Sequence, residues 1–326
     1  MNARPEWLGG VDPARRESFQ RAMNVAGAGA SLLQTYINKT VQQVHLRELG
    51  AAAVLPRRQG SGNAAYINRR TPGAAADWVA DTDSIAEATG THAQVNFPYK
   101  TLATRGRVTR GLQAKGRSYG DVLAGEMSAK AGDFTDTFEA GLITGDEGVD
   151  ANQFNGLITL TQATAGQIVI ATTNTAGDAM TLEGLDEAID KVKGAASRSD
   201  LVILGSFKAK RLLNSLLQAQ QQFNEIVEIG AGFRVRSYDG IPVVTTTKLP
   251  DVLAFNGSKV SAYTGGATTA LLIVNTRYVQ IEELTPLTVM PLAKTDSQFD
   301  EFDMFWDGSV VLDNPLGASI YCGIAA

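Results

Sequence analysis

The sequence predicts an α+β protein. Three features predict it: a long amphipathic helix, a middle section in which helices alternate with short strands, and a C-terminal third made mostly of strands. The chain has 326 residues, which is more than a single hydrophobic core usually organises. We therefore expect two packed domains or one elaborated domain.

The first third of the chain contains two segments of different character. Residues 11–50 read as a helical arm, because apolar residues recur there at helical intervals between arginines and glutamines. Residues 51–113 read as β structure, with two short runs on either side of the glycine-rich stretch 60–63. This pattern predicts a hairpin with its tip at 60–63, in an extended arm, followed by one or two strands within 94–113.

The clearest single element is a helix predicted over about 119–143. Ser118 is placed to cap it, with Asp121 three residues further on as a variant of the capping box. Small or apolar residues follow in steps of three or four, at positions 119, 123, 127, 131, 134, 138 and 142. The helix should end at Gly145 and bury one continuous stripe under the C-terminal strands.

The remainder alternates between helix and strand before it becomes mostly strand. Thr181 and Ser206 each precede a predicted helix, and the aliphatic run 201–204 between them predicts a buried strand. Short strands are expected at 233–240 and 241–247, and longer ones within 271–285 and 303–313. Residues 316–324 alternate between apolar and other side chains, which favours a final strand with one buried face.

Charge is distributed unevenly along the chain. Residues 1–120 contain 16 Lys and Arg and 8 Asp and Glu, a balance of +8, whereas residues 121–326 contain 13 and 26, a balance of −13. A chain that is acidic overall, with a net charge of −5, is a poor candidate for tight nucleic-acid binding over its whole surface. The opposite signs suit a molecule that packs against copies of itself, but they equally describe solvated faces of unequal sign.

The residues needed for common enzyme chemistry are scarce. The chain has two histidines and one cysteine, and it lacks the HExxH, CxxC, GxSxG and phosphate-loop motifs. The acidic loop 145–150 does not match the EF-hand spacing, and Glu282 and Glu283 are adjacent on a predicted strand, where their side chains face opposite ways. We therefore expect no catalytic residues, no cofactor and no metal, and a protein that is not an enzyme.

Four stretches, taken in chain order, carry a family resemblance: Trp78 to Leu102, Phe138 to Gly148, Asn155 to Ile158, and Gly240 to Val243. They resemble the return strand of an extended loop, the end of a spine helix with its turn, the short strand after it, and a strand of the axial domain. Those elements belong to the major capsid proteins of tailed bacteriophages, which have the Hong Kong 97-type fold. The resemblance covers residues 30–326.

The resemblance implies a division of the chain and a set of partners. Residues 1–50 would be the N-terminal arm, 51–104 the extended loop, 105–160 with 276–314 the peripheral domain, and 161–275 with 315–326 the axial domain. It implies a virion protein, assembled in the host cytoplasm, whose hexamers and pentamers form an icosahedral shell around double-stranded DNA. A portal is implied too, and the family allows a decoration protein.

Two departures from the family limit what is carried over. Some members cross-link through a lysine of the extended loop, but residues 51–99 contain no lysine, so we do not expect that chemistry. Some members carry a long N-terminal scaffolding segment, whereas the predicted arm is short. A separate scaffolding protein is therefore expected.

One hypothesis concerns residues that join subunits. Four arginines flank the predicted hairpin tip, and an acidic cluster lies between two C-terminal strands. In the resembling fold that cluster belongs to a peripheral domain, which a neighbour's extended loop approaches. We therefore expect some of these arginines to pair with the cluster across subunits, favoured by the bidentate geometry of guanidinium and carboxylate. The residues are Arg57, Arg58, Arg69 and Arg70 on one side and Asp296, Asp300, Glu301 and Asp303 on the other. The alternative is that these arginines only solubilise an exposed ribbon.

Two other functions remain open at this point. An encapsulin, a bacterial nanocompartment shell with the same fold, would be distinguished by protein cargo in place of nucleic acid. An unrelated α/β enzyme would be indicated by a monomeric protein in gel filtration.

Overall fold

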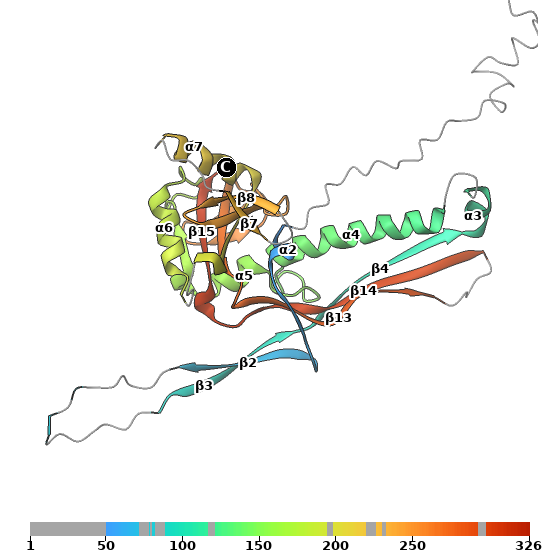
Figure 1. The fold of residues 1–326 in the computed structure, drawn as a ribbon, viewed down its shortest axis with the longest axis horizontal. Helices are drawn as coiled ribbons and strands as arrows, with labels where there is room; N and C mark the ends of the chain where they lie inside the picture. Colours follow the sequence, from blue (N-terminus) through green and yellow to red (C-terminus); the bar gives the residue numbers. More distant parts are fainter. Residues whose placement is uncertain are drawn as a thin grey trace, which may run out of the picture. The chain divides into compact units, whose positions relative to one another are not determined.

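The computed structural model describes residues 50–71, 78, 80–81, 89–116, 121–193, 198–219, 226–229, 233–292 and 298–326. The chain divides into two units, Met1–Val44 and His45–Ala326. The arm predicted over residues 11–50 lies outside the described residues, except for Gly50. Everything below concerns the second unit (Figure 1).

Among the described residues, seven strands form the largest sheet, in the order β5-β15-β12-β6-β9-β8-β7. Their bounds are β5 Ile168–Ile170, β6 Leu201–Gly205, β7 Ile226–Ile229, β8 Phe233–Tyr238, β9 Ile241–Thr245, β12 Thr268–Asn275 and β15 Ala318–Ala325. Helices α6 (Leu182–Lys191) and α7 (Phe207–Ala219) cover one face, where Leu185 and Leu213 pack against Ile203 and Ile273. The other face of the sheet carries Val202 and Leu204, which belong to a second hydrophobic core. The central strands are therefore buried on both sides.

The caps predicted for both of these helices are present. The Thr181 hydroxyl accepts a hydrogen bond from the backbone N–H of Gly184 at 3.1 Å, and the Ser206 hydroxyl accepts one from Ala209 at 3.0 Å. Each cap satisfies a first-turn N–H that has no partner within its helix. The final strand differs from its prediction, because β15 is buried from Ala318 to Ile324 and not on one face alone. Its position between β5 and β12, under helices on one side and the second core on the other, explains this.

A second sheet contains long strands in the order β1-β13-β14-β4. Their bounds are β1 Arg57–Gln59, β4 Lys100–Thr109, β13 Val279–Pro291 and β14 Phe299–Leu312. A short helix, α3 (Arg110–Gly116), follows β4 directly, and the long helix α4 (Val122–Thr144) runs back along β4 (Figure 1).

Helix α4 confirms the predicted long helix and corrects its beginning. The Asp121 carboxylate caps it by accepting hydrogen bonds from the N–H groups of Leu123 at 3.0 Å and Ala124 at 3.2 Å. Ser118, the predicted cap, lies outside the described residues. The apolar stripe is fully buried only in the second half of the helix, at Phe134, Phe138 and Leu142. The earlier described stripe positions 123, 127 and 131 are half-buried. Strand β4 lies beside the helix, and Trp306 of the C-terminal strand β14 packs edge-on against Phe138.

The hairpin predicted with its tip at residues 60–63 is wrong. Strand β1 pairs in parallel with β13, while β2 (Ala64–Thr71) pairs with β3 (Thr91–Pro98), so the hairpin connection is residues 72–90. The glycines serve a different purpose: a Cβ at Gly60 would overlap the Tyr99 ring, and Gly62 has a φ of 81°. Turn residues mark where the chain bends, but they do not say which strands pair.

A second correction concerns residues 155–158, predicted as a short strand. The structure has helix α5 (Leu157–Gln162) there, with Leu157, Ile158 and Thr161 buried. Short apolar runs do not distinguish a strand from a buried helical turn. β structure was also predicted from residue 51 onwards, but the one-turn helix α2 (Ala51–Val54) comes first.

The remaining described elements are short. They are β10 (Ala254–Phe255), which pairs with β11 (Val260–Ala262), and the 3-10 turns η3 (Ala165–Gln167), η4 (Arg198–Asp200) and η5 (Pro315–Gly317). Within the described part of the chain, none of the helices has the length and apolar character needed to cross a membrane.

Candidate inter-subunit contact residues

The first two arginines of the predicted set lie on β1 and pair within their own chain. The register of β1 places Arg57 and Arg58 beside the end of β13 that carries Glu282 and Glu283. Arg57 pairs with Glu283 at 2.5 Å, and Arg58 pairs with Glu282 at 2.5 Å and with Asp313 at 3.7 Å. The structure therefore uses these arginines to attach β1 to the edge of the four-stranded sheet.

Glu282 and Glu283 face opposite ways, as predicted from their adjacent positions on a strand. Glu282 accepts hydrogen bonds from Arg58 and from the Tyr99 hydroxyl, whereas Glu283 accepts one from the Trp306 indole at 3.0 Å. Burial, followed by the hydrogen bond to Glu282, raises the pKa of Tyr99 to about 12. Tyr99 separates β3 from β4, so this contact lies where the β2–β3 hairpin leaves the four-stranded sheet.

The other two arginines lie next to each other on β2 and therefore project to opposite faces. The Arg69 guanidinium donates hydrogen bonds to the carbonyl oxygens of Leu312 at 2.5 Å and Asp313 at 3.1 Å. Partial burial lowers the pKa of Arg69, and the two carbonyl oxygens compensate for the lost water contacts. Arg70 is exposed.

Three of the predicted carboxylates, Asp300, Glu301 and Asp303, lie on β14 itself and not in the loop between the two C-terminal strands, which corrects that prediction; they are at the opposite end of the four-stranded sheet from β1. Asp303 pairs with Arg105 through two bonds of 2.6 and 2.8 Å, and Glu301 pairs with Arg107 at 2.8 Å. Each carboxylate stands directly opposite its arginine in the antiparallel register of β14 and β4. Asp300, opposite Val108, is half-buried, and Asp296 lies outside the described residues.

The predicted arginines and carboxylates are thus not brought together within one chain. Arg57, Arg58 and Arg69 have partners at the base of the extended hairpin, and Glu301 and Asp303 have partners on β4. Pairing between two chains stays a prediction, and it now depends mainly on Arg70, whose side chain is exposed.

The role of one buried carboxylate was not anticipated from the sequence. Glu139 of α4 has no exposed surface, and its two oxygens accept hydrogen bonds from the N–H groups of Ala51 at 2.6 Å and Ala52 at 3.0 Å. The Thr246 hydroxyl, just after β9, donates a further bond at 3.4 Å. Glu139 therefore connects α4 and the seven-stranded sheet to the residues at which the described fold begins. Burial raises its pKa.

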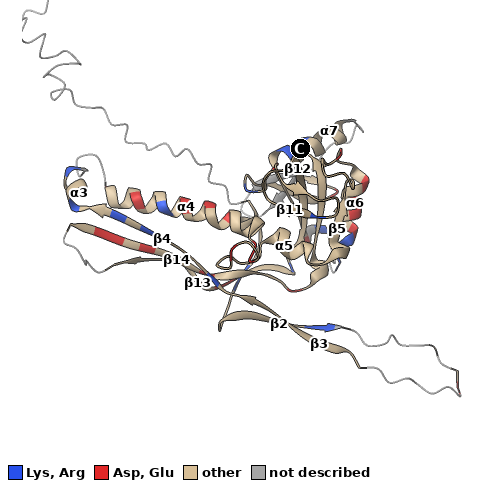
Figure 2. Cartoon of the chain, turned by 180° about the vertical axis from the view of Figure 1, so that it is seen from behind, with Lys and Arg blue, Asp and Glu red and all other residues tan. Residues whose placement is uncertain are grey.

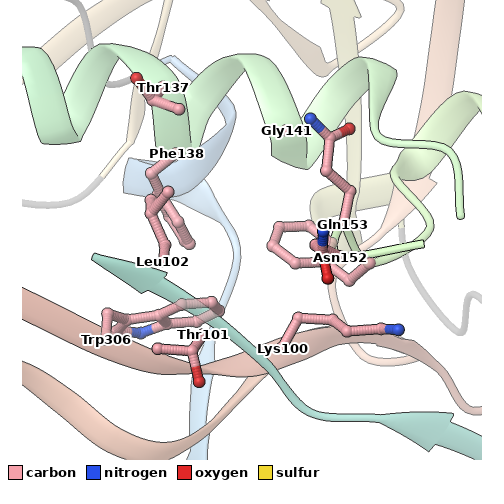
Figure 3. A pocket seen from close by; sticks show the side chains of 10 residues that line it. Lys100, Thr101, Leu102, Thr137, Phe138, Gly141, Asn152, Gln153 and Trp306 are labelled. Carbon is pink, nitrogen blue, oxygen red and sulfur yellow. The ribbon is translucent and has the colours of Figure 1, made fainter. Parts of the chain in front are cut away.

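A small pocket lies between α4 and the strands beneath it (Figure 3). It is lined mainly by apolar side chains, including those of Leu102, Phe138 and Trp306, and the ring centroids of the two aromatics are 4.9 Å apart. At its polar end, the Lys100 ammonium donates hydrogen bonds to Glu147 at 2.9 Å and to the Ala151 carbonyl oxygen at 2.6 Å. This lining offers no acid and base pair; it is a gap in the packing of the helix on the sheet.

Groups suited to metal binding or nucleophilic chemistry are not assembled in the described residues. No three side chains among their His, Cys, Asp and Glu residues could hold a metal ion together. Cys322 is buried in β15, and burial raises the pKa of its thiol to about 12. His92 is exposed on β3, and His45 lies outside the described residues.

The sequence of the chain matches the model of a known protein family. The family model described as SU10 major capsid protein matches residues 86–324. Comparison of the sequence with curated proteins gives no significant match.

Solved structures with a similar fold include capsids and an encapsulin. The SrpI encapsulin complex from Synechococcus elongatus PCC 7942 has a TM-score of 0.67 at 15% identity, over 91% of this chain and 95% of that chain. The capsid of the empty GTA particle has a TM-score of 0.67 at 17% identity, over 93% and 98%. The capsid of cyanophage A-1(L) has a TM-score of 0.66 at 14% identity, over 91% and 98%. At these identities the likeness shows the fold, which is the Hong Kong 97-type fold.

Proposed function

The chain belongs to the SU10 major capsid protein family, and from this premise we propose how it forms a shell. It is a structural protein of a tailed-phage capsid, located in the virion, and not an enzyme. Its capsid shell is assembled from oligomers. We propose that these oligomers are hexamers and pentamers, and that the shell is icosahedral and encloses double-stranded DNA.

The division of the chain into domains is part of the proposal. Residues 1–50 form the arm and 51–104 the extended loop; 105–160 with 276–314 form the peripheral domain, and 161–275 with 315–326 the axial domain. The two sheets support the separation of the last two domains. Strands β13 and β14 and helix α4 lie within the peripheral segments, whereas every strand of the seven-stranded sheet lies within the axial segments. Strand β1 and the first half of β4 belong to the extended loop and join it to the four-stranded sheet.

The observation that carries the proposal is the β2–β3 hairpin. Its two strands pair with each other, and residues 91–94 of β3 are exposed. An isolated two-stranded hairpin is marginally stable in water. The base of this one is held by Phe97 and Ala65, which are buried, and by the hydrogen bonds of Arg69 to Leu312 and Asp313. Beyond Arg69, none of the hairpin's described side chains is buried. A second copy of the chain would supply that support in a shell.

Hydrogen exchange on unassembled and assembled protein tests this role of the hairpin. We expect the backbone amides of residues 91–95 to exchange much more slowly in the shell than in the free subunit, while those of β12 exchange slowly in both. Equal protection of the hairpin in both states would contradict the proposal.

The proposal includes further partners: a separate scaffolding protein, a portal and, as an additional partner, a decoration protein. Assembly would take place in the host cytoplasm. The likeness to an encapsulin keeps a nanocompartment as the second candidate, although the family match favours a phage capsid. Nucleic acid inside purified particles supports the capsid, and protein cargo would support the nanocompartment.

A further inference from the structure

The outer half of β13 is an open edge of the four-stranded sheet. Strand β1 pairs with β13 only from Ile281 to Glu283. From Leu284 outwards, β13 has β14 on one side, and the described part of the chain places no strand on the other (Figure 1). An open strand edge presents unpaired N–H and C=O groups and is a template for a further strand.

Exposed apolar side chains gather on this edge. Leu287, Val289 and Met290 have relative exposures of 44%, 44% and 50%. Val289 stands opposite the buried Met304 in the register of β13 and β14, so the two side chains lie on the same face of the sheet. Leu287, two residues earlier on the strand, shares that face. The edge therefore offers apolar area that the subunit leaves in water.

The same stretch carries no charge. Residues 284–292 contain no Asp, Glu, Lys or Arg, whereas Figure 2 shows acidic residues on the neighbouring β14 and basic residues on β4. Strand edges that avoid pairing commonly carry charged side chains, lysine above all. This edge lacks that protection, so two copies of it can approach each other without repulsion between like charges.

The register of β13 determines which backbone groups point outwards. The Leu292 N–H donates to the carbonyl oxygen of Glu301 at 3.0 Å, so the backbone of Leu292 faces β14. Hydrogen-bonded and non-hydrogen-bonded positions alternate along an antiparallel pair, so Thr288 faces β14 as well. Its neighbours Leu287 and Val289 therefore direct their N–H and C=O groups towards the open edge.

Two prolines limit how far a partner strand can extend. Pro286 and Pro291 stand on either side of residues 287–290 and have no N–H to donate. A strand that adds to this edge is therefore confined to a short segment. Such a contact is specific and does not continue along the whole of β13.

We propose that the β13 edges of two subunits pair with each other as antiparallel strands, about a two-fold axis at Thr288. Leu287 of each copy then stands opposite Val289 of the other, and each opposed pair exchanges both of its N–H···O=C bonds. This register satisfies the outward N–H and C=O groups of both residues and covers their exposed side chains with those of the second copy.

The inference rests on the proposed function, since it names a surface by which two subunits of the shell are joined. A two-fold contact uses the same patch on both copies and joins only two of them, whereas rings need head-to-tail contacts. The β13 contact therefore belongs between the proposed hexamers and pentamers. A strand of another segment or protein is the competing occupant, but it would not place Thr288 beside its own copy.

The variant Thr288→Cys tests the two-fold axis directly. In the proposed register the two copies of residue 288 form a non-hydrogen-bonded pair, whose Cα atoms are about 4.5 Å apart, within the range that a disulfide spans. Mild oxidation of assembled Thr288→Cys should therefore join most subunits into covalent dimers on a non-reducing gel. The native Cys322 is buried and should not react.

Met290→Cys is the matched control, because it places an exposed cysteine on the same strand. In the proposed register its two copies would be offset by about four residues, or roughly 13 Å, which is too far for a disulfide. This variant should therefore stay monomeric on the gel under the same oxidation.

Val289→Lys tests the edge by a second route. A lysine on an edge strand opposes the addition of another strand, so this change should lower the assembled fraction about tenfold. Val289→Thr keeps a β-branched side chain suited to a strand and should lower it less. Assembly is measured by sedimentation and electron microscopy, and thermal unfolding of the unassembled subunit shows whether either change affects folding.

The outcomes separate this inference from the proposed function. If the wild-type chain forms no oligomers or shells, both fail. If it assembles but Thr288→Cys gives no covalent dimer, or Met290→Cys dimerises as readily, only the inference is overturned. It is also overturned if Val289→Lys folds and assembles like wild type. Loss of assembly in Val289→Lys without a dimer in Thr288→Cys would mean that a different strand occupies the edge, which overturns the two-fold pairing.

Discussion

Replacing Glu139 should detach the start of the described fold from the long helix. In Glu139→Ala, the N–H groups of Ala51 and Ala52 lose their acceptors while they stay buried. An unsatisfied buried donor costs about 1–3 kcal/mol, so the two together predict a loss of about 2–6 kcal/mol in the free energy of unfolding. Glu139→Gln keeps one carbonyl acceptor and should lose about half as much.

The assay for Glu139 combines a global and a local readout. Urea unfolding of the unassembled subunit gives the free energy, and hydrogen exchange reports the amides of Ala51 and Ala52 directly. Asp133→Ala, an exposed carboxylate on the same helix, is the control and should change the free energy by less than about 0.5 kcal/mol. An unchanged free energy in Glu139→Ala, with unchanged exchange at Ala51 and Ala52, would refute the reasoning.

Four further predictions follow from the structure. Phe138→Ala should cost about 3–5 kcal/mol in urea unfolding, since the ring is buried against Phe154 and Trp306; unchanged stability would contradict its place in the core. Gly106→Ala should destabilise the protein by about 1–3 kcal/mol because its Cβ would overlap the buried Phe302 ring. Gly125→Ala in α4 meets no atom within 4 Å and should stabilise it by about 0.4–1 kcal/mol. Changes in thermal stability of the same sign in both variants would contradict this. Burial raises the pKa of Glu139, so the folded state binds a proton more tightly than the unfolded state does. The difference in unfolding free energy between wild type and Glu139→Gln should therefore shrink as pH rises from about 4 through the raised pKa. A difference that grows over this range would show that the pKa of Glu139 is lowered. Arg70→Glu should reduce assembly if Arg70 contacts a neighbour's acidic cluster, and normal particle yield would leave it a solubilising charge.

The features predictable from the sequence were those determined by local interactions. A threonine or serine before a helix acts on N–H groups three residues away, so Thr181 and Ser206 identified two helices correctly. The aliphatic run at 201–204 predicted a buried strand because few other environments suit four such residues. The absence of an alternating pattern there also matched its burial on both faces.

The features that failed depend on partners distant in the sequence. Strand β1 pairs with β13 more than two hundred residues later, and no turn residue near Gly60 encodes that choice. Arg58 and Glu282 are also more than two hundred residues apart in the sequence. Their ion pair within one chain was therefore not predictable, and the arginine was expected on an exposed ribbon. Glu139 offered one signal, a carboxylate adjacent to Phe138 on the buried side of a helix, but its partners at Ala51 and Ala52 are visible only in the fold.

Electron microscopy of the purified protein tests the central claim most directly. As a member of the SU10 major capsid protein family with the Hong Kong 97-type fold, the chain should form hexamers, pentamers and closed icosahedral shells. In the shell density, the β2–β3 hairpin should contact a neighbouring copy. A protein that stays monomeric at every concentration, or a shell in which the hairpin contacts no other subunit, would contradict the account.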